Sequence, residues 1–180
     1  MTERDIQRWL FNDMRSSHEL IVPNYTPRDW HECDVWALTK AGYMTEHEIK
    51  LTVADFRADA EKTRRLYGPT WMPSRAVRKV DRLEKSDPRG PRRFWYVVPV
   101  GLIEKADVPE WAGLKVVERR VGTITGWVYE VKPAPELHRV KCDPKVVEHA
   151  RGVLYYRFWA EVERNATLLN KADMAKPIAS

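Results

Sequence analysis

Residues 32–59 read ECDVWALTKAGYMTEHEIKLTVADFRAD. The apolar run VWAL at 35–38 is typical of a short β-strand. The three residues that follow Thr39 suit a tight hairpin loop, because Gly42 tolerates the positive φ that such loops require. A second strand is predicted over 43–51, so the stretch is a β-hairpin that leads into a helix.

The length of the hairpin loop decides which side chains face each other. With a three-residue loop, Asp34 falls opposite Glu48, and Glu32 falls opposite Lys50. Because side chains alternate along a strand, these four residues project from one face, together with Glu46. A slip of one residue would put Asp34 and Glu48 on opposite faces.

Carboxylates that face each other across two strands destabilise a sheet unless a cation lies between them. Asp34 and Glu48 would supply carboxylate oxygens, and carboxylates, carbonyls and waters are the ligands that Mg²⁺ prefers. Lys50 would then lie beside the metal, where it would orient or deprotonate a water or offset phosphate charge. The alternative is that these residues are only the solvated outer face of an edge hairpin.

The spacing of Asp34, thirteen residues and then Glu48-Ile49-Lys50 resembles the active-site signature of the PD-(D/E)XK nuclease superfamily. The flanking segments resemble the MmcB-like group of DNA-repair and phage nucleases; these segments are HECD at 31–34, LTKAGY at 38–43, DFRAD at 55–59 and RFWYVVP at 93–99. The resemblance extends over roughly residues 5–118 and departs from the group at Cys33, where Ala is expected.

The resemblance implies an α/β fold, a restriction-endonuclease-like mixed sheet flanked by helices. It also implies a nuclease that hydrolyses phosphodiester bonds, with DNA as the expected substrate, during repair, recombination or phage DNA processing. Asp34, Glu48 and the Ile49 carbonyl would hold Mg²⁺ or Mn²⁺. Lys50 would position the attacking water, and Glu32 would orient Lys50 or bind a second metal through water.

Two alternatives to a DNA nuclease remain open at this point. One is a catalytically inactive nucleic-acid-binding or phage accessory protein that keeps the nuclease fold. The other is a ribonuclease or a nuclease specific for branched structures. In many nucleases of this superfamily an acid in the first helix adds to the metal site, and Glu3 is the candidate here, although a Glu at a helix start is also favoured by the helix dipole alone.

The composition is that of an ordinary globular protein. The chain has 180 residues, of which 43% are hydrophobic, and we predict a single domain over 1–170 followed by a tail at 171–180. The N-terminus is charged and no apolar run is long enough to cross a bilayer, so we expect no membrane association. Two cysteines far apart in sequence suit free thiols in the cytoplasm. A homodimer is left open.

The positive charge of the chain is concentrated in one segment. Net charge is +5, and residues 68–93 alone hold eight Lys or Arg against three acids. We predict that this segment is an insertion containing a basic helix over 75–85, and that it forms a flap that contacts DNA phosphates. The residues expected to make those contacts are Arg75, Arg78, Lys79 and Arg82.

The remaining elements follow from periodicity and capping signals. Helices are predicted over 2–16, from Thr52 to about Tyr67, and over 143–168, and strands are predicted over 19–23, 93–98, 114–119 and 123–132. The strand over 93–98 is apolar on both faces and should be central and buried, whereas the strand over 123–132 should lie at an edge. The inner face of the last helix is expected to consist of Val147, Leu154, Phe158 and Val162. In the helix after the hairpin, four basic residues are available to a backbone phosphate, or else are only solvated surface: Arg57, Lys62, Arg64 and Arg65. Asp59 is expected to form an ion pair with Lys62 or a neighbour.

Overall fold

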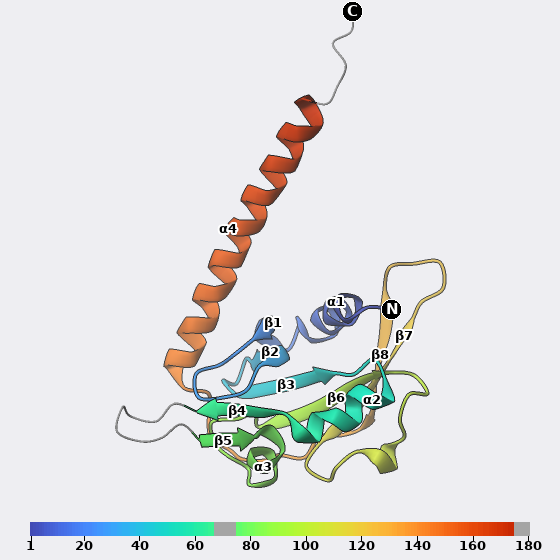
Figure 1. Ribbon diagram of the computed structural model, residues 1–180, viewed down its shortest axis with the longest axis vertical. Helices are drawn as coiled ribbons and strands as arrows, with labels where there is room; N and C mark the ends of the chain where they lie inside the picture. Colours follow the sequence, from blue (N-terminus) through green and yellow to red (C-terminus); the bar gives the residue numbers. More distant parts are fainter. Residues whose placement is uncertain (67–74, 175–180) are drawn as a thin grey trace, which may run out of the picture. The chain divides into compact units, whose positions relative to one another are not determined.

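A computed structural model describes residues 1–66 and 75–174 of the chain. Contacts divide the chain into two units, Met1–Asp143 and Pro144–Ser180, whereas the sequence predicted one domain over 1–170. The first unit has an α/β fold, a six-stranded mixed sheet with flanking helices (Figure 1), so the predicted restriction-endonuclease-like fold class is confirmed. Its elements are α1 (Glu3–Met14), β1 (His18–Tyr25), β2 (Cys33–Thr39), β3 (Met44–Ile49), α2 (Val53–Ala58), η1 (Asp59–Glu61), β4 (Thr63–Leu66), β5 (Arg75–Arg78), α3 (Lys79–Glu84), β6 (Arg93–Pro99), η2 (Lys105–Asp107), β7 (Gly113–Arg119) and β8 (Gly126–Lys132).

The strand order of the main sheet is β1-β2-β3-β6-β7-β8. β2 and β3 form the predicted antiparallel hairpin, and Gly42 in its loop has a φ of +84°. β3 then runs parallel to β6, and β6 runs parallel to β7. β6 is buried along its length and β8 lies at an edge, both as the sequence predicts. The hairpin that carries the candidate site is therefore joined directly to the buried centre of the sheet.

One face of the sheet is apolar and is covered by α1 (Figure 1). The Thr2 hydroxyl and the Asp5 carboxylate cap the start of this helix reciprocally, which fixes where it begins. Its buried side chains, Ile6, Trp9, Leu10 and Met14, pack against Val35, Ala37, Ile49, Trp95, Val97 and Val117 from the strands. Because side chains alternate along a strand, this packing sends the neighbouring residues of β2 and β3 to the opposite face.

The opposite face combines aromatic rings with buried charges. The Phe56 ring of α2 packs edge-on against Tyr96, with centroids 4.9 Å apart. The Lys79 ammonium group of α3 lies 5.5 Å from the centre of the Phe94 ring. α2 and α3 thus cover the side of the sheet that α1 leaves open, and on this side Lys79 donates a hydrogen bond to Glu48.

The helix predicted from Thr52 to Tyr67 is wrong beyond its first turns. The Thr52 hydroxyl caps α2 as expected, but the helix ends at Ala58 and a short 3₁₀ turn leads into β4. Asp59, at the break, is 1% exposed, and its carboxylate accepts hydrogen bonds from Lys50 and the Tyr96 hydroxyl. These buried tertiary contacts override a local helical pattern, which is only a weak preference.

The helix predicted over 75–85 is also wrong in its first half. Residues 75–78 form β5, which pairs antiparallel with β4 from Thr63↔Arg78 to Leu66↔Arg75. Helix α3 begins only at Lys79. Pairing between segments this far apart cannot be detected from helical periodicity, and the residues that join them, 67–74, lie outside the described part of the chain.

The second unit contains α4 (Pro144–Met174), which begins as predicted and continues past residue 168. Two of its residues expected on an inner face, Phe158 and Val162, are exposed. Of the predicted tail, 171–174 belong to this helix and 175–180 lie outside the described residues. Across 1–66 and 75–174, no helix is both long and apolar enough to span a membrane.

Candidate active-site cleft

The predicted register of the hairpin is confirmed. Val35 pairs with His47, and continuing that register by one residue places Asp34 opposite Glu48. The Ile49 backbone N–H donates a hydrogen bond of 2.7 Å to Oδ2 of Asp34, which ties the two strands together at this point. The two carboxylates that the sequence assigned to a metal therefore lie on the same face at the end of the hairpin.

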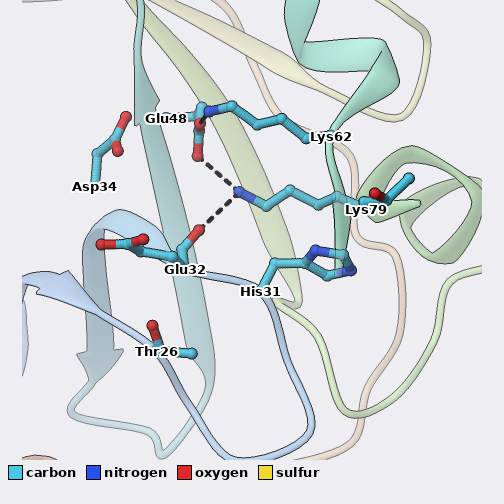
Figure 2. A pocket seen from close by; sticks show the side chains of 8 residues that line it. Thr26, His31, Glu32, Asp34, Glu48, Lys62 and Lys79 are labelled. Carbon is cyan, nitrogen blue, oxygen red and sulfur yellow. Dashed lines mark hydrogen bonds and ion pairs between the residues drawn. The ribbon is translucent and has the colours of Figure 1, made fainter. Parts of the chain in front are cut away.

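Asp34 and Glu48 open onto a cleft of about 380 Å³ (Figure 2). The cleft is lined by Thr26, His31, Glu32, Asp34, Glu48, Lys62, Thr63 and Lys79. Figure 2 shows the side chains of Lys62 and Lys79 reaching toward Glu48 from the side away from Asp34. Both lysines come from the segment after α2, so that segment forms one wall of the cleft.

Glu48 is 1% exposed and is surrounded by three lysines. Its Oε1 atom accepts hydrogen bonds from Lys50 at 2.9 Å and Lys62 at 2.7 Å. Its Oε2 atom accepts one from Lys79 at 2.7 Å. Burial by itself would raise the pKa of Glu48, but the positive charges of the lysines hold this pKa well below its ordinary range. Glu48 is therefore ionised and fixed in one orientation.

Asp34 has the opposite electrostatic environment. Burial and the negative charge of Glu48 raise the pKa of Asp34 to about 7, although the Ile49 N–H partly opposes the shift. Among the described residues no cation forms an ion pair with Asp34, so a cation placed in the cleft would stabilise its charged form. The Gln7 side chain donates to the Asp34 backbone carbonyl at 3.1 Å and to Glu3. Glu3 itself does not line the cleft.

Lys50 lies behind Glu48 instead of facing the cleft. It is 1% exposed, and its ammonium group donates to Glu48 and, at 2.7 Å, to Asp59. The predicted ion pair of Asp59 is confirmed with both Lys50 and Lys62. Glu48 and Asp59 orient Lys50, so the expectation that Glu32 does so is wrong. The reason is that β2 and β3 stop pairing before these two residues, which frees the Lys50 side chain to turn toward Asp59.

The prediction of an exposed DNA-contacting flap is wrong for Lys79 and Arg82, because both are buried. The Lys79 ammonium group lies 2.5 Å from Glu46 and 2.7 Å from Glu48, and it donates to the Glu32 backbone carbonyl at 3.1 Å. A buried lysine needs carboxylate partners, and the hairpin supplies two of them. Lys79 is therefore part of the interior of the candidate site.

Arg82 is likewise held inside the fold. It donates to Asp87 at 2.9 Å, and its guanidinium group lies 4.3 Å from the centre of the Trp30 ring. Arg78 is the member of the predicted set that faces outward, and it forms an exposed ion pair with Asp81. The side chain of Arg75 lies outside the described part of the structure, so its predicted phosphate contact stays a prediction.

Glu46 is a charged site residue to which the sequence assigned no role. It is completely buried, accepts a 2.7 Å hydrogen bond from the Trp30 indole and pairs with Lys79. In the sequence, its position on the same strand face as Glu48 was the signal that it could belong to the site. Its partner could not be inferred, because Lys79 follows it by 33 residues and reaches it only through the β4–β5 ribbon and α3.

The expected metal ligands fit a divalent cation in part. Asp34 and Glu48 offer two carboxylates in one cleft, and Mg²⁺ commonly binds one or two carboxylates while keeping several waters. Both oxygens of Glu48 already accept lysine hydrogen bonds, so a cation would share this carboxylate with them. Within 1–66 and 75–174, no group of three or more His, Cys, Asp or Glu side chains is arranged to hold a metal. The site therefore offers the donor chemistry for Mg²⁺ without a preassembled cage.

Comparisons with known proteins provide a structural relative. No family model matches the chain. No curated protein matches it either. A solved structure, described as the SPO1766 protein of unknown function from Silicibacter pomeroyi, is similar over 99% of this chain and 98% of its own, with a TM-score of 0.52 and 19% sequence identity. At this level of identity the likeness concerns the fold alone.

Proposed function

We propose that the protein is a divalent-metal-dependent nuclease of the PD-(D/E)XK type that hydrolyses phosphodiester bonds in DNA. The observation that carries this proposal is the pairing of Asp34 and Glu48 on neighbouring strands above one cleft, with Lys50 bonded to Glu48. The raised pKa of Asp34 supports it, because two nearby carboxylates with one poorly compensated charge favour a bound cation.

The side chains around the cleft have separate roles in this proposal. Asp34, Glu48 and the Ile49 carbonyl would hold Mg²⁺ or Mn²⁺. The bound ion would lower the pKa of a coordinated water and stabilise charge on the phosphate. Lys50 keeps Glu48 ionised and oriented through its own bond to Asp59. This arrangement holds the metal ligands in position before the substrate binds. Electrostatic catalysis gains most from groups that are positioned in advance in this way.

DNA is the proposed substrate because the described part of the basic segment, residues 75–93, adjoins the cleft through Lys79. Its outward-facing guanidinium groups, at Arg78 and Arg89, are available for phosphate contacts that do not depend on base sequence. Both cysteines are free, which suits the reducing cytoplasm of a bacterial or phage-infected cell.

The test is incubation with supercoiled, single-stranded and branched DNA, and with RNA, in Mg²⁺, Mn²⁺ or EDTA. We expect cleavage that requires the metal and falls about a thousandfold or more in Asp34→Asn, because losing a metal carboxylate removes several kcal/mol of barrier lowering. Asp13→Asn is the matched control, since Asp13 is an exposed carboxylate paired with Lys115. Absence of cleavage under every condition, or equal cleavage by Asp34→Asn, would sink the enzyme proposal.

A second candidate function is nucleic-acid binding without catalysis. The observation that favours it is the complete occupation of Glu48 by the three lysines, which compete with a metal for its oxygens. This alternative predicts DNA binding that is unchanged by EDTA, with no cleavage in any metal. Metal-dependent cleavage would exclude it.

A further inference from the structure

The three lysines bonded to Glu48 differ sharply in exposure. Lys50 and Lys79 are each 1% exposed, whereas the Lys62 side chain is 49% exposed. Lys62 and Lys79 line the cleft, and Lys50 does not. Exposure decides which of these ammonium groups a substrate phosphate can approach, and only Lys62 is accessible.

The contacts of the three lysines lead to the same conclusion as their exposure. Three oxygen atoms surround the Lys79 ammonium group, which donates hydrogen bonds to Glu48 and the Glu32 backbone carbonyl and forms an ion pair with Glu46. Glu48 and Asp59 enclose Lys50 in the interior. These contacts make both lysines fixed parts of the wall behind Glu48.

Lys62 combines a fixed backbone with an accessible cation. Its backbone N–H donates to Asp59, and its carbonyl accepts from the Lys79 N–H, so the residue is anchored at the mouth of the cleft. Its ammonium group donates a hydrogen bond of 2.7 Å to Glu48 Oε1 and forms an ion pair of 3.2 Å with Asp59 Oδ1. The exposed part of the Lys62 side chain therefore places a positive charge at the mouth of the cleft.

We propose that Lys62 is a catalytic residue that binds a non-bridging oxygen of the substrate phosphate, while Lys50 and Lys79 are positioning residues for Glu48. The inference rests on the proposed nuclease function, and it gives the substrate-facing role to a lysine outside the Glu48-Ile49-Lys50 motif. No bond is made or broken at Lys62, which contributes a hydrogen bond and a positive charge.

The test measures DNA binding and turnover separately. In an Asp34→Asn background, which prevents turnover, the Kd for a labelled 20-base-pair duplex is measured in Mg²⁺ from 50 to 200 mM KCl. Loss of one phosphate contact should reduce the slope of log K against log[salt] by about 0.9. We expect this change in Lys62→Gln, the parental slope in Lys62→Arg, and no change in Lys40→Gln, which alters an exposed lysine in the hairpin loop.

In the enzyme with Asp34 intact, Lys62→Gln should lower kcat/KM about 10- to 100-fold, and Lys62→Arg should recover part of that loss. If the wild type cleaves DNA but Lys62→Gln keeps the parental salt slope and kcat/KM, the assignment of Lys62 is wrong while the nuclease proposal stands. If the wild type neither cleaves nor binds any nucleic acid, the proposed function fails and this inference fails with it. Thermal melting of each variant confirms folding.

Discussion

Lys79→Met tests whether the basic segment is built into the site or covers its outside. Lys79 is 1% exposed, and its ammonium group lies 2.5 Å from Glu46 and 2.7 Å from Glu48. Its neighbour in sequence, Arg78, forms an exposed ion pair with Asp81 and provides the matched control. Two consecutive basic residues therefore have opposite environments.

The expected loss of unfolding free energy depends on which charged groups each substitution leaves without a partner. Met fills much of the volume of the Lys79 stem, so Lys79→Met removes the charge with little loss of packing. Two buried carboxylates, Glu46 and Glu48, then lose a shared cation. Breaking a buried ion pair from one side costs about 3–5 kcal/mol of unfolding free energy. Arg78→Ala breaks an exposed pair that water and salt screen, so it should cost much less than Lys79→Met.

Urea denaturation, monitored by tryptophan fluorescence at pH 7, measures the loss of unfolding free energy in both variants. Adding Glu46→Gln to Lys79→Met removes one of the stranded charges, so the double variant should be more stable than additivity predicts, with a coupling energy of about 1–3 kcal/mol. If Lys79→Met costs no more than Arg78→Ala, or if the double variant is strictly additive, then Lys79 is not buried between the two carboxylates and the argument for an internal lysine is refuted.

Three further outcomes are expected. Partial burial alone would raise the Asp87 pKa, but hydrogen bonds from Arg89 and Arg82 depress it. Asp87→Asn should therefore cost about 1 kcal/mol at pH 7, a figure reduced for solvent screening of these pairs. A depressed pKa gives stability above the unfolded-state value near 3.9 that is lost as pH falls, so urea titrations should show this deficit shrinking between pH 5 and pH 3. Gly90→Ala places a Cβ 2.3 Å from the Trp30 ring and should lower unfolding free energy by about 1–3 kcal/mol in thermal melts. Asp34→Asn should weaken Mg²⁺ binding by about tenfold or more in calorimetry.

A matched control variant tests each of these three predictions. Asp81→Asn, at an exposed carboxylate, should show little deficit at pH 7, and a deficit in Asp87→Asn that is constant with pH would contradict the linkage. Gly152→Ala meets nothing within 4 Å, so equal destabilisation by Gly90→Ala and Gly152→Ala would contradict the steric argument. Glu32→Gln should weaken Mg²⁺ binding less than Asp34→Asn does, and the reverse order would move the metal site.

Local sequence patterns were sufficient for much of the sheet. The loop that ends at Gly42 and the alternation along β2 and β3 placed Asp34 opposite Glu48, because hairpin register depends on loop length and on residues a few positions apart. The unbroken apolar run of β6 predicted a buried central strand for a similar reason. The Thr2 cap fixed the start of α1 through bonds within its first turn.

The positions of the lysines depended on the tertiary structure. Residues 59–66 and 75–78 carry helix-like patterns, yet they form a 3₁₀ turn and a two-stranded ribbon, because Asp59 is fixed by Lys50 and Tyr96 and the strands pair across 67–74. This ribbon brings Lys79 back to the hairpin, where its charge neutralises Glu46 and Glu48.

Local sequence patterns predict the hairpin, its register and the pair of carboxylates at its end, because each depends on residues close together in the chain. The places of the lysines follow from the folded chain, in which Lys50 lies behind Glu48, Lys79 is internal and Lys62 faces the cleft. The physical reason is that a buried charge takes whichever partner the fold brings within hydrogen-bonding distance, and the 14 and 31 residues that separate Lys62 and Lys79 from Glu48 leave no local pattern from which to read that partner.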